Sequence, residues 1–353
     1  MEIGVFLLQQ MRERSTGPAG VVAETIEQTV LAEQLGFDVV WFAEHHFANL
    51  GMCPSPLLAA AHAAARTRRV KLGTGVVVLP FYNPMRLVDE IAYVDVLSGG
   101  RLVLGVGSGS HRHEFDGLGV PIAEARRRFE EVLDVVDQAR EAGRVALEGE
   151  HVRVAPTDLP LTPIQRPIPL YLAGLARDAA MVERVAARDY TPFVSAMWMP
   201  SAAVAAVRAP YDAARARIGR PPGRFAIQRL VFVTDDPAEA REAAERAIYT
   251  HRIVASLKAG TGAFDRGYVG ETPHAGDPTP EDVLDKAMIG PAERCIAMLR
   301  EDIRVVRPSH LSLFMGFGGM DHRRVVRSME RFMREVAPHL RAEASSDRSA
   351  AAT

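Results

Sequence analysis

Short apolar runs alternate along the chain with longer segments of helical period. Eight runs are rich in β-branched and aromatic residues and have the length of strands, and several are apolar on both faces, as a parallel sheet covered on both sides requires. Between the runs, apolar residues recur three and four positions apart, as at Leu87, Ile91 and Val94, which predicts amphipathic helices. The predicted strands are Ile3–Leu8, Val39–Phe42, Val70–Leu79, Leu102–Val106, Pro169–Ala173, Tyr190–Val194, Phe225–Val233 and His310–Met315.

This order indicates an α/β protein whose parallel strands are joined by crossover helices. Eight strands, each followed by a helix, favour closure into a (β/α)8 TIM barrel over residues 1–340. A doubly wound open sheet is the competing interpretation. Residues 341–353 have no apolar period, and we expect this tail to be disordered.

Two stretches interrupt the alternation. Residues Glu148–Arg166 end in PLTPIQRPIP, which is typical of an irregular surface insertion before the fifth strand. Residues Ala259–Ile289 contain several glycines and prolines, a composition suited to a mobile active-site lid. Simple disorder of this second segment is an open alternative.

Composition narrows the classes of partner. The chain has 353 residues, 48% of them hydrophobic, and a formal net charge of -2, so neither nucleic acid nor an anionic membrane is an expected partner. Cys53 and Cys295 are far apart and form no zinc or disulfide pattern, so both are expected to be buried and inert. The first residues, MEIGVFLL, predict a strand instead of a signal peptide, which favours a cytoplasmic location.

Candidate chemistry follows the second strand, where VVWFAEHHF ends in Glu44, His45 and His46. Catalytic groups of barrel enzymes lie at the carboxyl ends of strands, so this position favours proton transfer. Adjacent strand residues face opposite sides, so one metal ion is not expected to bind both histidines, and no metal site is predicted. Two histidines hydrogen-bonded in a loop are the structural alternative.

Glycines interrupt the third and fourth strands. Gly73 and Gly75 indicate either a kink or a flat group lying against the backbone. Gly105, Gly107 and Gly109 suggest part of a phosphate-binding loop, but polar SHRHEFDG follows where a dinucleotide site needs a helix. HRHE does not need to bind a metal, because a solvated loop would hold the same residues, and we interpret it as such a loop.

An arginine run, Arg126 to Arg128, begins a predicted helix whose apolar side is formed by other residues. At least one of these arginines points away from that side, where it could bind a ligand phosphate. A solvated basic turn explains the run equally well.

Several segments together resemble the bacterial luciferase-like monooxygenase family. They are FAEHHF, GTGVVVLPFYNPMRLVDEIAYVDVLSGGRLVLGVG, PLYLAG, GPAERCIAMLRED and GFGGMDHRRVVRSMERFMREVAPHL, which span nearly the whole chain. The resemblance implies a (β/α)8 barrel that receives reduced FMN from a separate flavin reductase, activates O2 and inserts one oxygen atom into a small-molecule substrate. It also implies a homodimer.

The resemblance assigns residues as well. His45 matches the histidine implicated in acid–base steps, with Glu44 and His46 beside it. Gly75 and Val76 match a segment where the family often has a non-proline cis peptide under the isoalloxazine ring, and Gly107 matches a position next to that ring.

The phosphate site departs from the family pattern. Ser108 stands where the family has an arginine after the fourth strand. The backbone of the segment after the fifth strand could hold a phosphate at a helix start, with charge supplied by Arg126 or by that segment itself. The segment consists of Gly174, Leu175, Ala176 and Arg177.

The altered phosphate site leaves two alternatives to an FMN-dependent monooxygenase. One is a dehydrogenase or reductase that uses a deazaflavin coenzyme on the same barrel. The other is a non-catalytic flavin-binding protein. Phe6, Trp198 and the lid are expected to line a partly apolar substrate pocket, but they do not identify the substrate.

Overall fold

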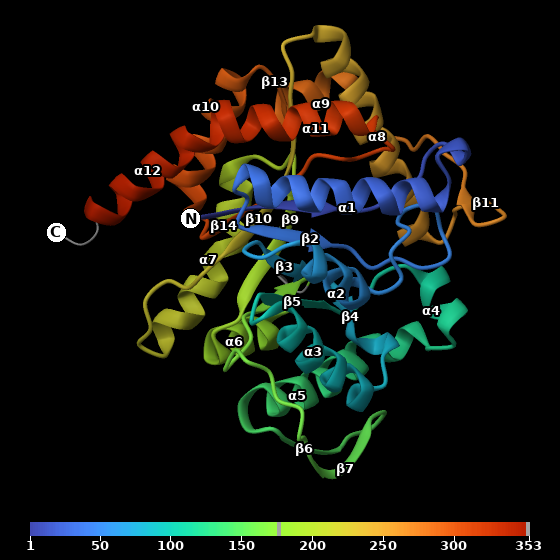
Figure 1. Ribbon diagram of the computed structural model, residues 1–353, viewed down its shortest axis with the longest axis vertical. Coiled ribbons are helices and arrows are strands. Elements are labelled where there is room, and N and C mark those ends of the chain that lie inside the picture. Colours follow the sequence, from blue (N-terminus) through green and yellow to red (C-terminus); the bar gives the residue numbers. More distant parts are fainter. Residues whose placement is uncertain (175–177, 351–353) are drawn as a thin grey trace.

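The predicted strands form a closed ring. The computed structural model describes residues 1–174 and 178–350, and in it eight parallel strands surround a common core while helices cover the outside (Figure 1). This arrangement confirms the (β/α)8 barrel and is not an open sheet. The barrel strands are β1 (Glu2–Leu7), β2 (Val39–Phe42), β3 (Lys71–Thr74), β5 (Leu102–Gly107), β8 (Leu170–Ala173), β9 (Thr191–Met197), β10 (Ala226–Val233) and β14 (His310–Phe314).

Strand pairing around the ring is parallel throughout. The first strand pairs with β2 on one side and with the last strand, β14, on the other, where Glu2 lies opposite His310. The pairing of β9 with β10, with Phe193 opposite Ala226, completes the closure. All eight carboxyl ends therefore open at one end of the barrel, which is where barrel enzymes hold their active sites.

The third predicted strand is shorter than expected. We predicted one strand over Val70–Leu79, but β3 ends at Thr74, and β4 (Val77–Val78) pairs separately with β5. The peptide bond between Gly75 and Val76, which separates the two strands, is cis, as the family resemblance implied.

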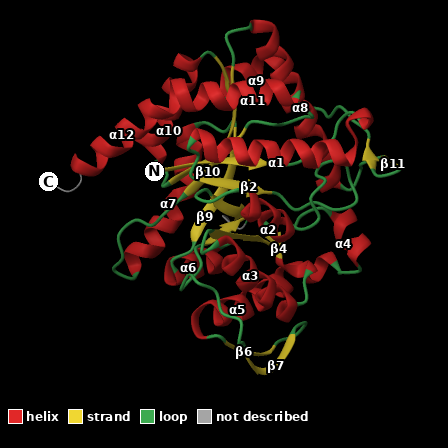
Figure 2. Ribbon diagram, viewed as in Figure 1, coloured by secondary structure: helices red, strands yellow, loops and turns green. Residues whose placement is uncertain are grey.

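Helices follow the strands and bury their apolar faces on the barrel (Figure 2). Sequence signals fix their starts: the side chain of Asn83 accepts hydrogen bonds from the backbone N–H groups of Met85 and Arg86, and Pro84 is the first helical residue. The helices are α1 (Gly17–Leu35), α2 (Pro56–Arg66), α3 (Pro84–Ser98), α4 (Arg112–Leu118), α5 (Ala125–Ala142), α6 (Ala179–Arg188), α7 (Ser201–Arg217), α8 (Pro237–Ala259), α9 (Pro280–Lys286), α10 (Ala292–Val306), α11 (His322–Arg331) and α12 (Ala337–Ala350).

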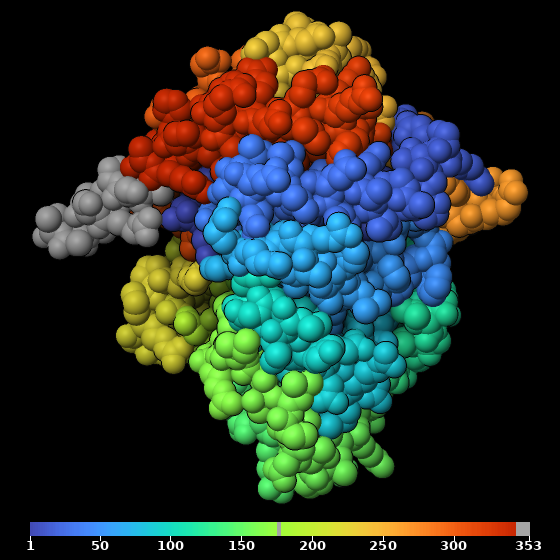
Figure 3. All heavy atoms as spheres, viewed as in Figure 1, coloured from blue at the N-terminus to red at the C-terminus, as the bar shows by residue number. Residues whose placement is uncertain are grey.

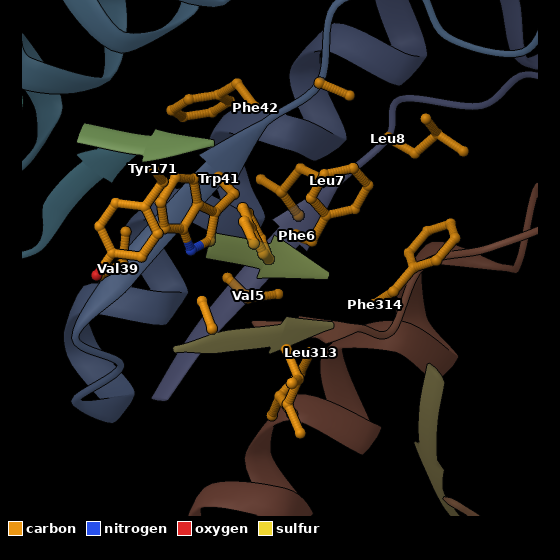
Figure 4. Packing of buried hydrophobic residues seen from close by; sticks show 14 of the residues in the cluster. Val5, Phe6, Leu7, Leu8, Val39, Trp41, Phe42, Tyr171, Leu313 and Phe314 are labelled. Atoms are coloured by element: carbon orange, nitrogen blue, oxygen red, sulfur yellow. The ribbon is translucent and has the colours of Figure 1, made fainter. Parts of the chain in front are cut away.

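Aromatic side chains fill the barrel interior, with Trp41 at their centre. Figure 4 shows Trp41 beside Tyr171, and their ring centroids are 5.0 Å apart. The indole Nε1 donates a 2.9 Å hydrogen bond to Nε2 of the fully buried His310. A Cβ atom on Gly73 would lie 2.4 Å from the indole, so the flat group against this glycine is the protein's own tryptophan.

The insertion before the fifth barrel strand is more regular than expected. It begins earlier than the predicted Glu148–Arg166 and forms an antiparallel hairpin of β6 (Arg144–Glu148) and β7 (Arg153–Asp158), which protrudes at the bottom of Figure 3. The side chain of Glu131 on α5 accepts hydrogen bonds from three consecutive backbone N–H groups of the turn. The carboxylate satisfies these backbone N–H groups. The turn is therefore held in place although its sequence has no apolar pattern that would predict it.

The predicted lid, Ala259–Ile289, also contains regular structure. A short hairpin of β11 (Phe264–Asp265) and β12 (Tyr268–Val269) is followed by α9 and by β13 (Met288–Gly290), which pairs in parallel with β10. Three-residue and two-residue strands are too short to give a periodic signal, so the sequence pattern missed them.

The last described helix, α12, extends to Ala350, and its alanine, glutamate and arginine residues favour helix without an apolar stripe. The disordered tail over residues 341–353 stays a prediction, and residues 351–353 lie outside the described residues. Both cysteines are buried and free, as predicted. Among the described residues, every helix is too short or too polar to cross a lipid bilayer.

Candidate active site

The loop after β2 carries Glu44, His45 and His46 at the carboxyl end of the barrel, and α4 packs beside it. The backbone N–H of His45 donates a 3.0 Å hydrogen bond to the carbonyl of Cys53, which fixes the bend of the loop. The two histidines are held by different carboxylates, His45 by Glu114 and His46 by Glu44, and do not act as one cluster.

His45 is paired with Glu114 on α4. The distance from His45 Nδ1 to Glu114 Oε1 is 3.0 Å, and the same oxygen accepts a 3.0 Å hydrogen bond from the backbone N–H of His46. Burial opposes ionisation of Glu114, but hydrogen bonds from His111 and His45 outweigh it and hold the pKa of this carboxyl well below its usual range. Glu114 is therefore a carboxylate that orients His45.

A third group, His111, completes this cluster. Its Nδ1 lies 3.6 Å from Glu114 Oε2, its Nε2 is buried with no hydrogen-bond partner among the described residues, and burial lowers its pKa. Our interpretation of HRHE as a solvated loop was wrong, because α4 begins at Arg112 and Glu114 is only 2% exposed. The helical spacing of His111, Glu114 and Phe115 was the available signal for this buried face.

His46 is paired with Glu44 instead. Its Nε2 lies 2.9 Å from Glu44 Oε1, while Glu44 Oε2 accepts hydrogen bonds from the backbone N–H of Val78 at 3.1 Å and from the Tyr82 hydroxyl at 2.9 Å. Burial raises the pKa of Glu44. These contacts connect the His45 loop with the chain that follows the cis peptide, so Glu44 positions two segments of the site.

The residues expected near a flavin ring lie close to one another. The Gly75 N–H donates a 2.7 Å hydrogen bond to the Phe42 carbonyl at the end of β2. A Cβ atom on Gly75 would lie 3.1 Å from the Phe6 ring, and one on Gly107 would lie 2.8 Å from the Val76 side chain. The structure thus brings together the ends of the two predicted strands that the family resemblance assigned to the ring.

The residues expected near a phosphate are only partly described. Arg126 on α5 forms ion pairs with Glu130 at 2.7 Å and with Asp178 at 3.0 Å, and Asp178 caps the start of α6. Arg126 Nη1 is buried and has no partner among the described residues. Ser108 directly follows β5, and Gly174 directly follows β8 with a left-handed φ of 88°. Leu175, Ala176 and Arg177 lie outside the described residues.

A hairpin lies against the loop that carries the histidines. The Val269 N–H donates a 2.9 Å hydrogen bond to Asn49 Oδ1, and the Asn49 N–H donates one of 3.0 Å to the Gly267 carbonyl. The Phe264 ring centroid lies 5.3 Å from that of His113 on α4. The β11–β12 hairpin thus occupies the place of a lid, while its mobility stays a prediction.

Trp198, the other aromatic residue expected in the pocket, follows β9 at the same end of the barrel. Its ring centroid lies 5.6 Å from that of His251 on α8. Phe6 belongs to the apolar core, and Trp198 packs against that core. This end of the barrel therefore contains apolar as well as polar side chains.

Known proteins resemble this chain along its full length. The family model described as luciferase-like monooxygenase matches residues 1–306. An uncharacterized protein, y4vJ, of Sinorhizobium fredii is 33% identical over 96% of this chain and 97% of its own. The oxygenase component of the flavin-dependent trigonelline monooxygenase of Acinetobacter baylyi is 27% identical over 89% of both chains.

Solved structures share the same barrel. The monooxygenase RslO1 of Streptomyces bottropensis superimposes with a TM-score of 0.83 at 26% identity, covering 96% of this chain and 100% of its own. An F420-dependent secondary alcohol dehydrogenase superimposes with a TM-score of 0.73 at 18% identity, covering 95% of this chain and 98% of its own. At that identity, the second comparison shows a common fold alone.

Proposed function

The chain belongs to the luciferase-like monooxygenase family, and on this basis we propose that it uses reduced FMN and O2 to oxygenate a small, partly apolar organic substrate. The observation that carries the proposal is the pairing of His45 with the buried carboxylate of Glu114 at the open end of the barrel. A separate flavin reductase is the proposed source of reduced FMN, which is supported by the similarity to an oxygenase component.

The described residues fit a flavin mononucleotide. Gly75 and Gly107 carry no side chain and lie, with Val76, at the ends of neighbouring strands, which suits a planar ring. Nη1 of Arg126, buried and without a partner among the described residues, lies beside the start of α6 and suits a phosphate, while Ser108 and Gly174 follow the paired strands β5 and β8. Bound reduced flavin supplies the electrons that activate O2.

Proton transfer is the proposed role of His45. A carboxylate can only accept hydrogen bonds, so its 3.0 Å contact with Glu114 places a proton on His45 Nδ1 and leaves Nε2 as the acceptor. Glu114 and Glu44 act as positioning residues, since each holds one histidine and the backbone of a neighbouring segment.

Exclusion of water is the proposed role of the β11–β12 hairpin. A site that activates O2 needs shelter from bulk solvent, because solvent access lets the activated oxygen be lost before it meets the substrate. The contacts of Val269 and Gly267 with Asn49 hold the hairpin against the loop that contains His45.

A deazaflavin-dependent dehydrogenase is the second candidate. It is favoured by Ser108 in the place of an arginine and by the two carboxylates that already pair with Arg126. Both features reduce the positive charge available to the FMN phosphate, which would then be bound less tightly than the family pattern implies.

Anaerobic binding distinguishes the two candidates. Purified protein is titrated with reduced FMN and, in parallel, with a reduced deazaflavin coenzyme, and binding is followed by calorimetry. We expect saturable, one-to-one binding of reduced FMN, followed by consumption of O2 when air is admitted with a panel of apolar substrates. Tighter binding of the deazaflavin, without O2 consumption, would support the dehydrogenase. Binding of neither would contradict both.

A further inference from the structure

We propose that His45, His111 and Glu114 form a binding site for a transition-metal dication of the Zn²⁺ type. One ligand atom from each of the three residues lies within 4.8 Å of the other two. Two imidazoles and one carboxylate are a ligand set that Zn²⁺ accepts, with the fourth position left for water. The proposal rests on these contacts and does not depend on a flavin.

The spacing of the ligand atoms suits a tetrahedral ion. Metal–ligand distances of about 2.0–2.1 Å place neighbouring ligands of a tetrahedral Zn²⁺ about 3.3 Å apart. Nδ1 of His45 lies 3.0 Å from one oxygen of Glu114, and Nδ1 of His111 lies 3.6 Å from the other. The three ligand atoms lie within 4.8 Å of one another, so side-chain rotations that bring them to about 3.3 Å would admit an ion.

Neighbouring backbone groups hold the ligand residues in place but leave some of their ligand atoms without a hydrogen bond from the backbone. Glu114 Oε1 is anchored by the backbone N–H of His46, which leaves Oε2 for an ion, and the backbone of His45 is anchored at Cys53. Such contacts behind the ligands preserve their orientation when a metal binds. His46 is excluded from the site, because its Nε2 is paired with Glu44.

The protonation states agree with this geometry. A metal ion binds neutral imidazole and ionised carboxylate. Burial lowers the pKa of His111, and the hydrogen bonds from the two histidines keep Glu114 ionised. We predicted no metal site, because His45 and His46 face opposite sides of the chain and because HRHE, which contains His111 and Glu114, does not need a metal if it forms a solvated loop.

Occupation of this site has a consequence for the proposed function. A metal bound at Nδ1 of His45 moves the ring proton to Nε2, so His45 can no longer accept a proton there. Zn²⁺ is therefore expected to inhibit turnover reversibly.

The test uses the full-length protein without flavin. Co²⁺ is titrated under visible absorption spectroscopy and then displaced by Zn²⁺, and calorimetry gives the stoichiometry. We expect one Co²⁺ per chain with the intense bands of tetrahedral coordination, and at least tenfold weaker binding for His111→Ala and for Glu114→Gln. His113→Ala is the matched control, because this histidine lies on the same helix outside the cluster.

Each result decides the proposal. A wild-type protein without a one-to-one tetrahedral Co²⁺ spectrum overturns it, whether or not the variants fold. Equal binding by the wild type, His111→Ala and Glu114→Gln also overturns it. Binding at the site without inhibition of turnover supports the metal site and counts against the role of His45 in the proposed function.

Discussion

His45 and Glu114 are 69 positions apart in the chain, and their side chains share a 3.0 Å hydrogen bond at the open end of the barrel. The loop after β2 supplies the imidazole, and α4, after β5, supplies the carboxylate. The side chain of His45 is 18% exposed, whereas that of Glu114 is 2% exposed. The imidazole is therefore partly accessible, while its anionic partner stays buried.

Replacement of His45 tests its chemical role. His45→Asn retains an amide N–H that can donate to Glu114 but removes the basic nitrogen, so we expect turnover to fall about 10²- to 10⁴-fold. Reduced-FMN affinity and thermal stability should change little. The measurement is substrate oxygenation under single-turnover conditions, with His62→Asn on the exposed face of α2 as the control. Unchanged turnover would refute the proposed role.

Glu114 should make stability depend on pH. Its folded-state pKa lies below the ordinary value of 4.5, so the ionised carboxylate stabilises the fold above that pH, and this contribution is lost as the pH falls toward the folded-state pKa. The difference in melting temperature between wild type and Glu114→Gln should therefore be largest above about pH 5 and should narrow in acid. Val40→Ala, an apolar control in β2, should differ from the wild type in melting temperature by the same amount at every pH.

Arg126 is expected to contribute to phosphate binding. Arg126→Ala should weaken reduced-FMN binding by about 1–3 kcal/mol through loss of a charged hydrogen bond. Arg127→Ala is the matched control, because the neighbouring arginine is 55% exposed and pairs with Glu131. Calorimetric titrations of both variants decide the question. If Arg126→Ala and Arg127→Ala bind reduced FMN equally well, the phosphate contact would be assigned to Arg177, which lies outside the described residues.

A buried ion pair joins β10 to α10. Nε of Arg229 donates a 2.8 Å hydrogen bond to Asp302, and both side chains are almost fully buried. Arg229→Met should lower the free energy of unfolding by about 3–5 kcal/mol, because it leaves Asp302 buried without its countercharge. The double variant with Asp302→Leu should recover much of that loss. Urea denaturation of the wild type, Arg229→Met, Asp302→Leu and the double variant checks this, and additive losses would contradict it.

Gly105 lies where no side chain fits. A Cβ atom there would lie 2.0 Å from the Thr74 carbonyl oxygen, so Gly105→Ala should destabilise the barrel by about 3 kcal/mol or more. Gly20→Ala is the control within α1, where the nearest atom lies 3.4 Å away and the helix should gain about 0.5–1 kcal/mol. Thermal denaturation compares the two, and similar melting temperatures would refute the steric argument.

The sequence pattern predicts the barrel well because each strand carries its own signal. Runs such as Val39–Phe42 are buried on both faces, so their apolar residues are continuous and independent of distant contacts. The strand β13 lacks this signal, since it has three residues and depends on β10 for its pairing.

The site is predicted less completely than the fold. The position of His45 after a strand indicates its location, whereas its partner Glu114 belongs to a polar segment whose burial depends on packing against that loop. Gly73 shows the same limit, because the ring that requires its small size belongs to Trp41 on the neighbouring strand. Contacts between segments distant in sequence leave no local pattern.

Asn49 connects substrate access to the alignment of the reacting groups. Besides its two contacts with the β11–β12 hairpin, its side-chain amide donates 3.1 Å hydrogen bonds to the Met11 carbonyl and to the Tyr249 hydroxyl. Any outward movement of the hairpin has to break bonds to a residue four positions after His45. If the hairpin opens to admit substrate, the loop that carries His45 loses two of its hydrogen bonds, so we expect the proposed proton transfer to be confined to the closed enzyme.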